Sequence, residues 1–123
     1  PNTKFVAEFI GSPQMNLFQC KIENGLAKIS DMQINLNNSL NIQDACIGVR
    51  PDDILISDQG EYSSSANLVE YLGSDMIIYS SVGGQEFSCK LSSKINLKAG
   101  DNFKFDISPS VLHIFDNTSG QRA

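Results

Sequence analysis

The sequence has no tryptophan, only three tyrosines, and nine Lys and Arg residues scattered through a chain whose formal net charge is −5. A nucleic-acid site normally gathers basic residues on one face and adds aromatic side chains on which bases can stack. The composition therefore argues against DNA or RNA as a partner.

Cysteine and histidine are also scarce. Cys20, Cys46 and Cys89 lie far apart, no C-x-x-C spacing occurs, and His113 is the single histidine. This argues against a zinc site. An odd cysteine count without a secretory leader predicts a reduced, cytosolic compartment and buried structural thiols. No apolar run approaches the roughly 20 residues that a membrane span requires.

Catalytic motifs are missing as well. There is no G-x-x-x-x-G-K-[ST] phosphate loop. His113 stands in the alternating stretch 111–115, which predicts a partly buried structural imidazole rather than a member of a triad. Asp52 and Asp53 follow Pro51, which is ordinary turn chemistry. We expect Arg50 to pair with a carboxylate or a carbonyl there, and we predict no enzyme.

At 123 residues and 41 % apolar content, the chain should form one domain with a modest core. Its start predicts a short helix that Asn2 or Thr3 caps and that Gly11 and Pro13 end. The apolar stripe of this helix consists of Phe5, Val6, Phe9 and Ile10. So short a helix must pack on this domain, on a partner or on a missing neighbour. Because the chain begins at Pro1 without an initiator methionine, we expect it to be a piece of a longer protein.

Beyond Pro13, apolar residues recur at every second position, which indicates β-strands. Asn24-Gly25 predicts a type I′ hairpin, and further turns are expected at 73–74, 83–84 and 99–101. A polar loop is expected at 35–43, and a final strand at 111–115. The residues predicted to alternate toward the interior are Phe18, Cys20, Ile22, Met32, Ile34, Leu36, Phe87, Cys89, Leu91, Phe103, Phe105 and Ile107. About nine or ten such strands favour a small β-barrel or sandwich.

Four stretches resemble one protein family. "FVAEFIGSPQMN" (5–16) is similar to the segment of sugar-type ABC importer ATPases that joins the nucleotide-binding domain to the C-terminal regulatory domain. "GVRPDDI" (48–54) resembles a second family motif, although Asp52 stands where Glu is usual. "VEYLGSDMIIY" (69–79) resembles a strand and turn, and "LHIFDNTSGQR" (112–122) resembles the closing motif.

The resemblance implies a mainly β fold: a small OB-fold-like (TOBE) β-barrel with a short N-terminal helix. Residues 1–15 would be a connector helix and linker from a missing nucleotide-binding domain, and 16–123 the regulatory β domain. ATP and Mg²⁺ would bind in the missing domain, so no cofactor is expected in this chain. The implied partners are that domain, a second copy of the ATPase subunit in a homodimer, and the permease subunits through the missing domain. The implied location is the cytoplasmic face of the inner membrane.

Functional positions are expected in the connector and in two turns, although a purely structural use of each stays open. Phe5 and Phe9 would pack against the missing domain, and their exposure predicts self-association. The candidate regulatory or interface positions are Phe5, Phe9, Gly11, Ser12, Pro13, Met15, Asn16, Arg50, Pro51, Asp52, Gly73 and Ser74.

Two alternative functions stay open: the binding of a small anion and the binding of an oligonucleotide or oligosaccharide. Residues 63–67, "SSSAN", resemble the Ser-Ala-Arg-Asn stretch of molybdate-binding relatives, and backbone N–H groups and hydroxyls could hold an anion although the arginine is absent. A saturable rise of the melting temperature with molybdate would favour this alternative. An oligonucleotide- or oligosaccharide-binding barrel is the other alternative, for which salt-dependent binding of single-stranded DNA is the test.

Overall fold

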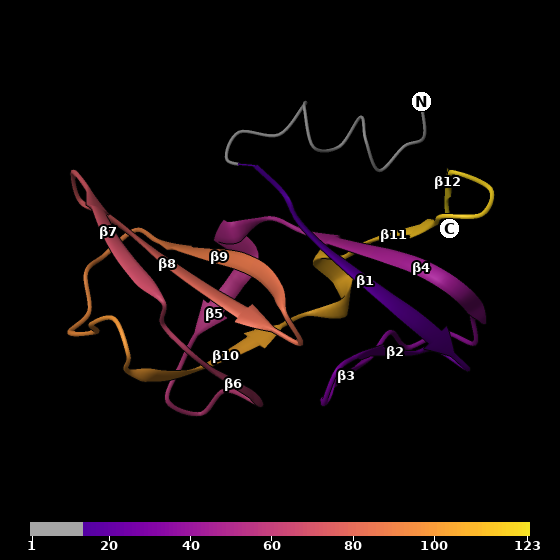
Figure 1. Cartoon of the computed structure of the whole chain (residues 1–123), viewed down its shortest axis with the longest axis horizontal. Helices are drawn as coiled ribbons and strands as arrows, with labels where there is room; N and C mark the ends of the chain where they lie inside the picture. The colour runs from indigo at the N-terminus through magenta and orange to yellow at the C-terminus, as the bar shows by residue number, and fades with distance from the viewer. Residues whose placement is uncertain (1–13) are drawn as a thin grey trace.

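The structure is a computed structural model, and it describes residues 14–123 (Figure 1). The predicted helix and the positions Phe5, Phe9, Gly11, Ser12 and Pro13 lie outside the described residues. The strands are β1 (Asn16–Glu23), β2 (Leu26–Ile29), β3 (Met32–Asn35), β4 (Ile42–Val49), β5 (Ile54–Ile56), β6 (Tyr62–Ser65), β7 (Leu68–Leu72), β8 (Asp75–Val82), β9 (Gln85–Leu91), β10 (Asn102–Ile107), β11 (His113–Asp116) and β12 (Gln121–Arg122). Two 3₁₀ turns complete the described elements: η1 (Pro51–Asp53) and η2 (Pro109–Val111).

The strands pair antiparallel in three sheets. A six-stranded sheet has the order β12-β11-β4-β1-β2-β3, and two three-stranded sheets have the orders β5-β10-β6 and β7-β8-β9. Strand pairing in residues 14–123 does not close any of these sheets on itself. The predicted mainly β class is confirmed, and within residues 14–123 the strands form three open sheets around a common core.

The tight hairpins follow from residues that tolerate positive φ. Asn24 and Gly25 have φ values of 48° and 77°, and Gly83 and Gly84 have 56° and 77°. Positive φ at both central positions is what a type I′ turn requires. The predictions of hairpin turns at these two places are therefore confirmed.

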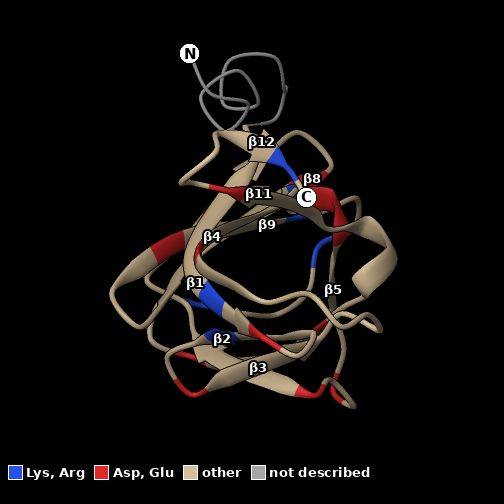
Figure 2. Cartoon of the chain, turned by 90° about the vertical axis from the view of Figure 1, so that its right-hand side faces the viewer, with Lys and Arg blue, Asp and Glu red and all other residues tan. Residues whose placement is uncertain are grey.

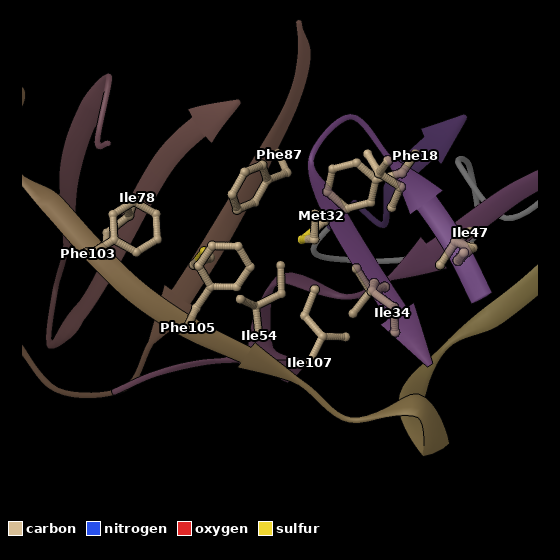
Figure 3. Packing of buried hydrophobic residues seen from close by; sticks show 14 of the residues in the cluster. Phe18, Met32, Ile34, Ile47, Ile54, Ile78, Phe87, Phe103, Phe105 and Ile107 are labelled. Carbon is tan, nitrogen blue, oxygen red and sulfur yellow. The ribbon is translucent and has the colours of Figure 1, made fainter. Parts of the chain in front are cut away.

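A chain of aromatic rings joins the three sheets in the core (Figure 3). Phe18 of β1 and Phe87 of β9 have ring centroids 5.5 Å apart, and Phe87 and Phe105 of β10 are also 5.5 Å apart. Both distances lie in the range that favours tilted aromatic pairs. Each ring comes from an inward position of the predicted alternation, so the core is the meeting point of the three sheets.

Several boundaries differ from those predicted. The expected strand at 111–115 starts only at His113, because Pro109 begins a 3₁₀ turn that takes up Val111. The loop expected at 35–43 is shorter, since Asn35 ends β3 and Ile42 begins β4. The short strand β12 was not foreseen.

Charged residues are dispersed over the fold. In the view of Figure 2, Lys and Arg lie on separate strands, and many Asp and Glu lie in the turns between strands. Three ion pairs are formed in the described part of the chain, by Lys21 and Lys28 with Glu23 and by Lys90 with Asp75. Partly exposed pairs of this kind contribute little to stability.

Candidate functional site

The described end of the connector lies against the turn that follows β4. Asn16 pairs with Val49 in the β1–β4 ladder, so the residue before it, Met15, lies near Arg50 and Pro51. Met15 and Pro51 are both buried. Met15 lies over Gly48, where an added Cβ would collide with its sulfur. The structure therefore brings two of the three predicted segments together.

Asn16 joins the six-stranded sheet to the β7-β8-β9 sheet. Its side-chain amide donates to the carbonyl oxygen of Ser88 at 2.8 Å and accepts from the backbone N–H of Ser88 at 2.8 Å. Asn16 is only 7 % exposed. The amide thus replaces the peptide unit that a strand ladder would supply between β1 and β9.

A second side-chain amide makes the same kind of bridge further along β1. Gln85 accepts from the N–H of Gln19 at 2.6 Å and donates to the carbonyl oxygen of Gln19 at 2.9 Å. Residues 14–123 form no backbone ladder between β1 and β9. Neither bridge was predicted, because nothing in the local pattern links positions 66 or 72 residues apart.

A polar cluster continues from Gln19 to the turn after β11. The side-chain amide of Asn117 donates to Oε1 of Gln19 at 2.8 Å and to Oδ1 of Asp44 at 2.9 Å. The backbone N–H of Asn117 donates to the carbonyl oxygen of Asp44 at 3.0 Å. This cluster holds the closing segment against β1 and β4.

The turn after β4 is a 3₁₀ turn with Pro51 at its start. The N–H of Asp53 donates to the carbonyl oxygen of Arg50 at 2.9 Å, while the side chain of Asp52 is exposed. The Arg50 guanidinium forms no ion pair or hydrogen bond with residues 14–123, so the expected bridge is not made within that part of the chain. The prediction of a turn rather than a converging carboxylate pair agrees with this geometry.

His113 is half-buried on β11, and its Nδ1 contacts the guanidinium of Arg122. Burial lowers the pKa of His113 below its usual range, and the charges of Arg122 and Arg50 lower it further, against Asp53. Within the described residues its ring has no nucleophile or carboxylate hydrogen-bonded to it. The imidazole thus has the surroundings of a structural residue.

The thiols are largely buried, as predicted. Cys46 and Cys89 are buried and Cys20 is half-buried. Burial raises the pKa of Cys89 to about 12, and burial together with the nearby Cys46 raises the pKa of Cys20 to about 12. Thiols in such surroundings are poor nucleophiles at neutral pH.

The third predicted segment stands apart from the other two. Gly73 and Ser74 form the tip of the β7–β8 hairpin, where an added Cβ on Gly73 would meet open space. Figure 1 shows this tip at one end of the molecule. The candidate positions therefore divide into the connector with the β4–η1 turn and a separate hairpin tip.

The three serines of the stretch "SSSAN", residues 63–65, line an open pocket of about 670 Å³ together with Asp58 and Lys104. The Ser64 hydroxyl is already bonded to the hydroxyl of Ser80 at 2.6 Å and to the carbonyl oxygen of Ser81 at 3.0 Å. The acidic residue Asp58 lines the same pocket. An anion would find fewer donors here than the sequence suggests.

Residues 14–123 contain no cluster of three His, Cys, Asp or Glu residues placed to hold a metal ion. No helix in that range has the length and hydropathy of a membrane span.

Comparisons with known proteins agree with this architecture. Residues 11–54 match the family described as the MalK OB fold domain, and residues 47–115 match the TOBE domain family. The glycerol-3-phosphate import ATP-binding protein UgpC 2 of Agrobacterium fabrum is 32 % identical over 129 residues, which cover 99 % of this chain and 35 % of that protein. The oligosaccharides import ATP-binding protein MsmX of Bacillus subtilis is 30 % identical, over 99 % of this chain and 38 % of that protein.

Fold and matches together define a mainly β domain of the TOBE type, similar to one part of import ATP-binding proteins. The chain belongs to the TOBE domain family, with the MalK type of OB fold preceding and overlapping the TOBE region. It spans between about a third and two fifths of the length of these relatives.

Proposed function

We propose that this chain is the C-terminal regulatory part of the ATP-binding subunit of an ABC importer for sugars or sn-glycerol-3-phosphate. The observation that carries the proposal is the extent of the likeness: 99 % of the chain aligns with import ATP-binding proteins of both kinds. In those proteins the likeness covers only 35 to 38 % of the length, which leaves room for a separate ATP-binding domain.

In this role the chain does not hydrolyse ATP by itself, since ATP and Mg²⁺ would bind in the preceding domain. Its contribution is contact with a second copy of the subunit, at the cytoplasmic face of the inner membrane. Such a contact keeps the two ATP-binding domains at a high effective concentration while they open and close. The permease subunits are reached through the ATP-binding domain.

The turn after β4 is suited to transmit changes in the connector. Met15 packs on Gly48, two positions before Arg50, and Pro51 fixes the bend. The Arg50 guanidinium, which has no ion pair within residues 14–123, is available to a carboxylate of a neighbouring domain. Movement of the connector is therefore coupled to this turn.

A chimera tests the proposal. Residues 14–123 replace the corresponding part of Agrobacterium UgpC 2, and glycerol-3-phosphate uptake and ATP hydrolysis are compared with the same protein lacking that part. We expect the chimera to assemble and to restore uptake. A folded, assembled chimera with the activity of the deletion would contradict the proposal.

The turn has its own matched pair of variants within the chimera. Arg50→Gln should lower uptake without loss of folding, because it removes the cation beside the connector. Lys104→Gln removes an exposed cation on β10 and should leave uptake unchanged. Equal effects of the two substitutions would remove the turn from the mechanism.

A further inference from the structure

An open pocket of about 530 Å³, the β7–β9 pocket, lies on the outer face of the β7-β8-β9 sheet. Leu68, Tyr79 and Ser88 form one row of this face, because Tyr79 pairs with both of the others on neighbouring strands (Figure 1). Ile78, next to Tyr79, belongs to the main core, so the row faces the other way. Asn16 of β1 also lines the pocket, whose volume is within the range of small-molecule sites.

Hydrogen bonds within the fold fix the floor of the β7–β9 pocket. The side-chain amide of Asn16 is bonded to both backbone groups of Ser88. The Tyr79 hydroxyl donates to Oε1 of Glu70 at 2.7 Å, and the carbonyl oxygen of Tyr79 accepts from the N–H of Asn67 at 2.7 Å. A ligand does not have to order these groups, which favours binding.

Three polar side chains at the rim of the pocket are left for a ligand. Gln14, Asn67 and Glu86 line the pocket and are exposed. Their side chains form no hydrogen bond or ion pair with residues 14–123. The two amides can each donate and accept, and the carboxylate can accept. The rim therefore offers donors and acceptors together.

A smaller pocket of about 190 Å³ adjoins the β7–β9 pocket. Gln14, Tyr79 and Ser88 line both pockets, and Lys90 lines the smaller one. The ammonium group of Lys90 is paired with Asp75 at 3.6 Å, so its charge is largely balanced. Together the two pockets form a longer site with Tyr79 at their junction.

We propose that this site binds a neutral sugar of two rings. The Glu86 carboxylate is the one charged group among the described residues that line the β7–β9 pocket, and it repels anions, phosphorylated sugars included. An ammonium ligand has donors only, and would leave the amide N–H groups of Gln14 and Asn67 unpaired. Sugar hydroxyls both donate and accept, and the C–H face of a sugar ring can pack on Leu68, which is 51 % exposed, and on Tyr79.

A nuclear magnetic resonance titration of the full chain tests the inference. The ¹⁵N-labelled protein is titrated with three neutral disaccharides of different linkage: maltose, sucrose and lactose. We expect at least one of them to shift the backbone amide signals of Asn67, Tyr79 and Ser88 saturably, with a dissociation constant in the millimolar range. The signals of Ser63 and Asn102, which line the separate pocket on β6 and β10, should stay in place.

Two asparagine variants form a matched pair. Asn67→Ala removes a donor and an acceptor from the rim and keeps the backbone N–H that bonds to Tyr79, so it should weaken binding about tenfold. Asn102→Ala removes an exposed amide on β10 and should leave the dissociation constant unchanged. Glu86→Gln should keep sugar binding and strengthen the binding of glucose 6-phosphate, because the repelling charge is gone.

Three results would overturn the inference. The first is that none of the three disaccharides gives saturable shifts at the β7–β9 pocket. The second is that Asn102→Ala weakens binding as much as Asn67→Ala. The third is that ethylammonium or glucose 6-phosphate binds the unaltered chain more tightly than every disaccharide, since charge would then select the ligand. These measurements use this chain alone, so they can fail while the uptake experiment with the chimera succeeds, and the reverse.

Discussion

Replacing Asn16 by alanine removes both hydrogen bonds that its side-chain amide makes with the backbone of Ser88, between β1 and β9. The N–H and the carbonyl oxygen of Ser88, each bonded to the amide at 2.8 Å, then lose their partner in a part-buried site. Each unsatisfied buried group costs about 1–3 kcal/mol. Because this site is only part-buried, we take about 1–2 kcal/mol for each of the two groups, which gives a loss of about 2–4 kcal/mol in the free energy of unfolding. That is roughly a third of the total stability of about 10 kcal/mol for a domain of this size.

The matched control is Gln85→Ala, which removes a bridge of the same chemistry at 2.6 Å and 2.9 Å. Gln19, the partner of this bridge, is exposed, so water can take over the lost hydrogen bonds. We therefore expect a loss of only about 0.5–1 kcal/mol. The two variants remove the same pair of backbone hydrogen bonds and differ mainly in burial, although Asn16→Ala also removes a long hydrogen bond of 3.5 Å from the Ser88 hydroxyl.

Urea unfolding followed by far-ultraviolet circular dichroism measures both values, since the chain has no tryptophan to report by fluorescence. The slope against urea should stay constant, so that the midpoint alone reports stability. Equal losses for the two variants, or a larger loss for Gln85→Ala, would refute the argument that burial decides the strength of these bridges.

Three further predictions concern titration and turn geometry. Because the pKa of His113 is lowered on folding, the free energy of unfolding should decrease as the pH falls below the pKa of the unfolded state. The difference between the urea midpoints at pH 7 and pH 5 should therefore be smaller in His113→Asn than in the unaltered protein. The pKa of Cys89 is raised from 9.0 to about 12, so the contribution of its thiol to stability is complete below pH 9 and is lost between pH 9 and pH 12. Cys89→Ala should therefore reduce the fall in urea midpoint between pH 8 and 10. An unchanged fall would contradict this prediction. Gly25→Ala should lower the melting temperature more than Gly84→Ala, since both have φ of +77° but only Gly25 lies against backbone atoms; similar losses in calorimetry would show that φ alone matters.

The features of the fold that could be predicted from the sequence are those that short-range interactions determine. Asn24-Gly25 predicted its hairpin because few other dipeptides accept positive φ at both positions. The alternation of Phe103, Phe105 and Ile107 predicted which side faces the core, and all three are buried. These features depend on neighbours within a few residues.

Features that depend on distant pairing were not foreseen. The Asn16–Ser88 bridge joins residues 72 apart, and an asparagine in a strand looks the same whether its amide faces water or a backbone. The division into three open sheets likewise follows from which strand edges meet in space. For the candidate site, the motifs pointed to Met15, Asn16 and the turn at Arg50, but only the register of β1 and β4 brings them together.

Because the two amide bridges are made by side chains, single amino-acid substitutions can change the hydrogen bonding between the two sheets. Every residue except proline has both a backbone donor and a backbone acceptor. The hydrogen bonds of an ordinary strand ladder are therefore kept after most amino-acid substitutions. The hydrogen bonds described between β1 and β9 instead come from the side chains of one asparagine and one glutamine, beside the contact of the Phe18 and Phe87 rings. Lineages can therefore strengthen or loosen the coupling between the two sheets by single substitutions, without redrawing either sheet.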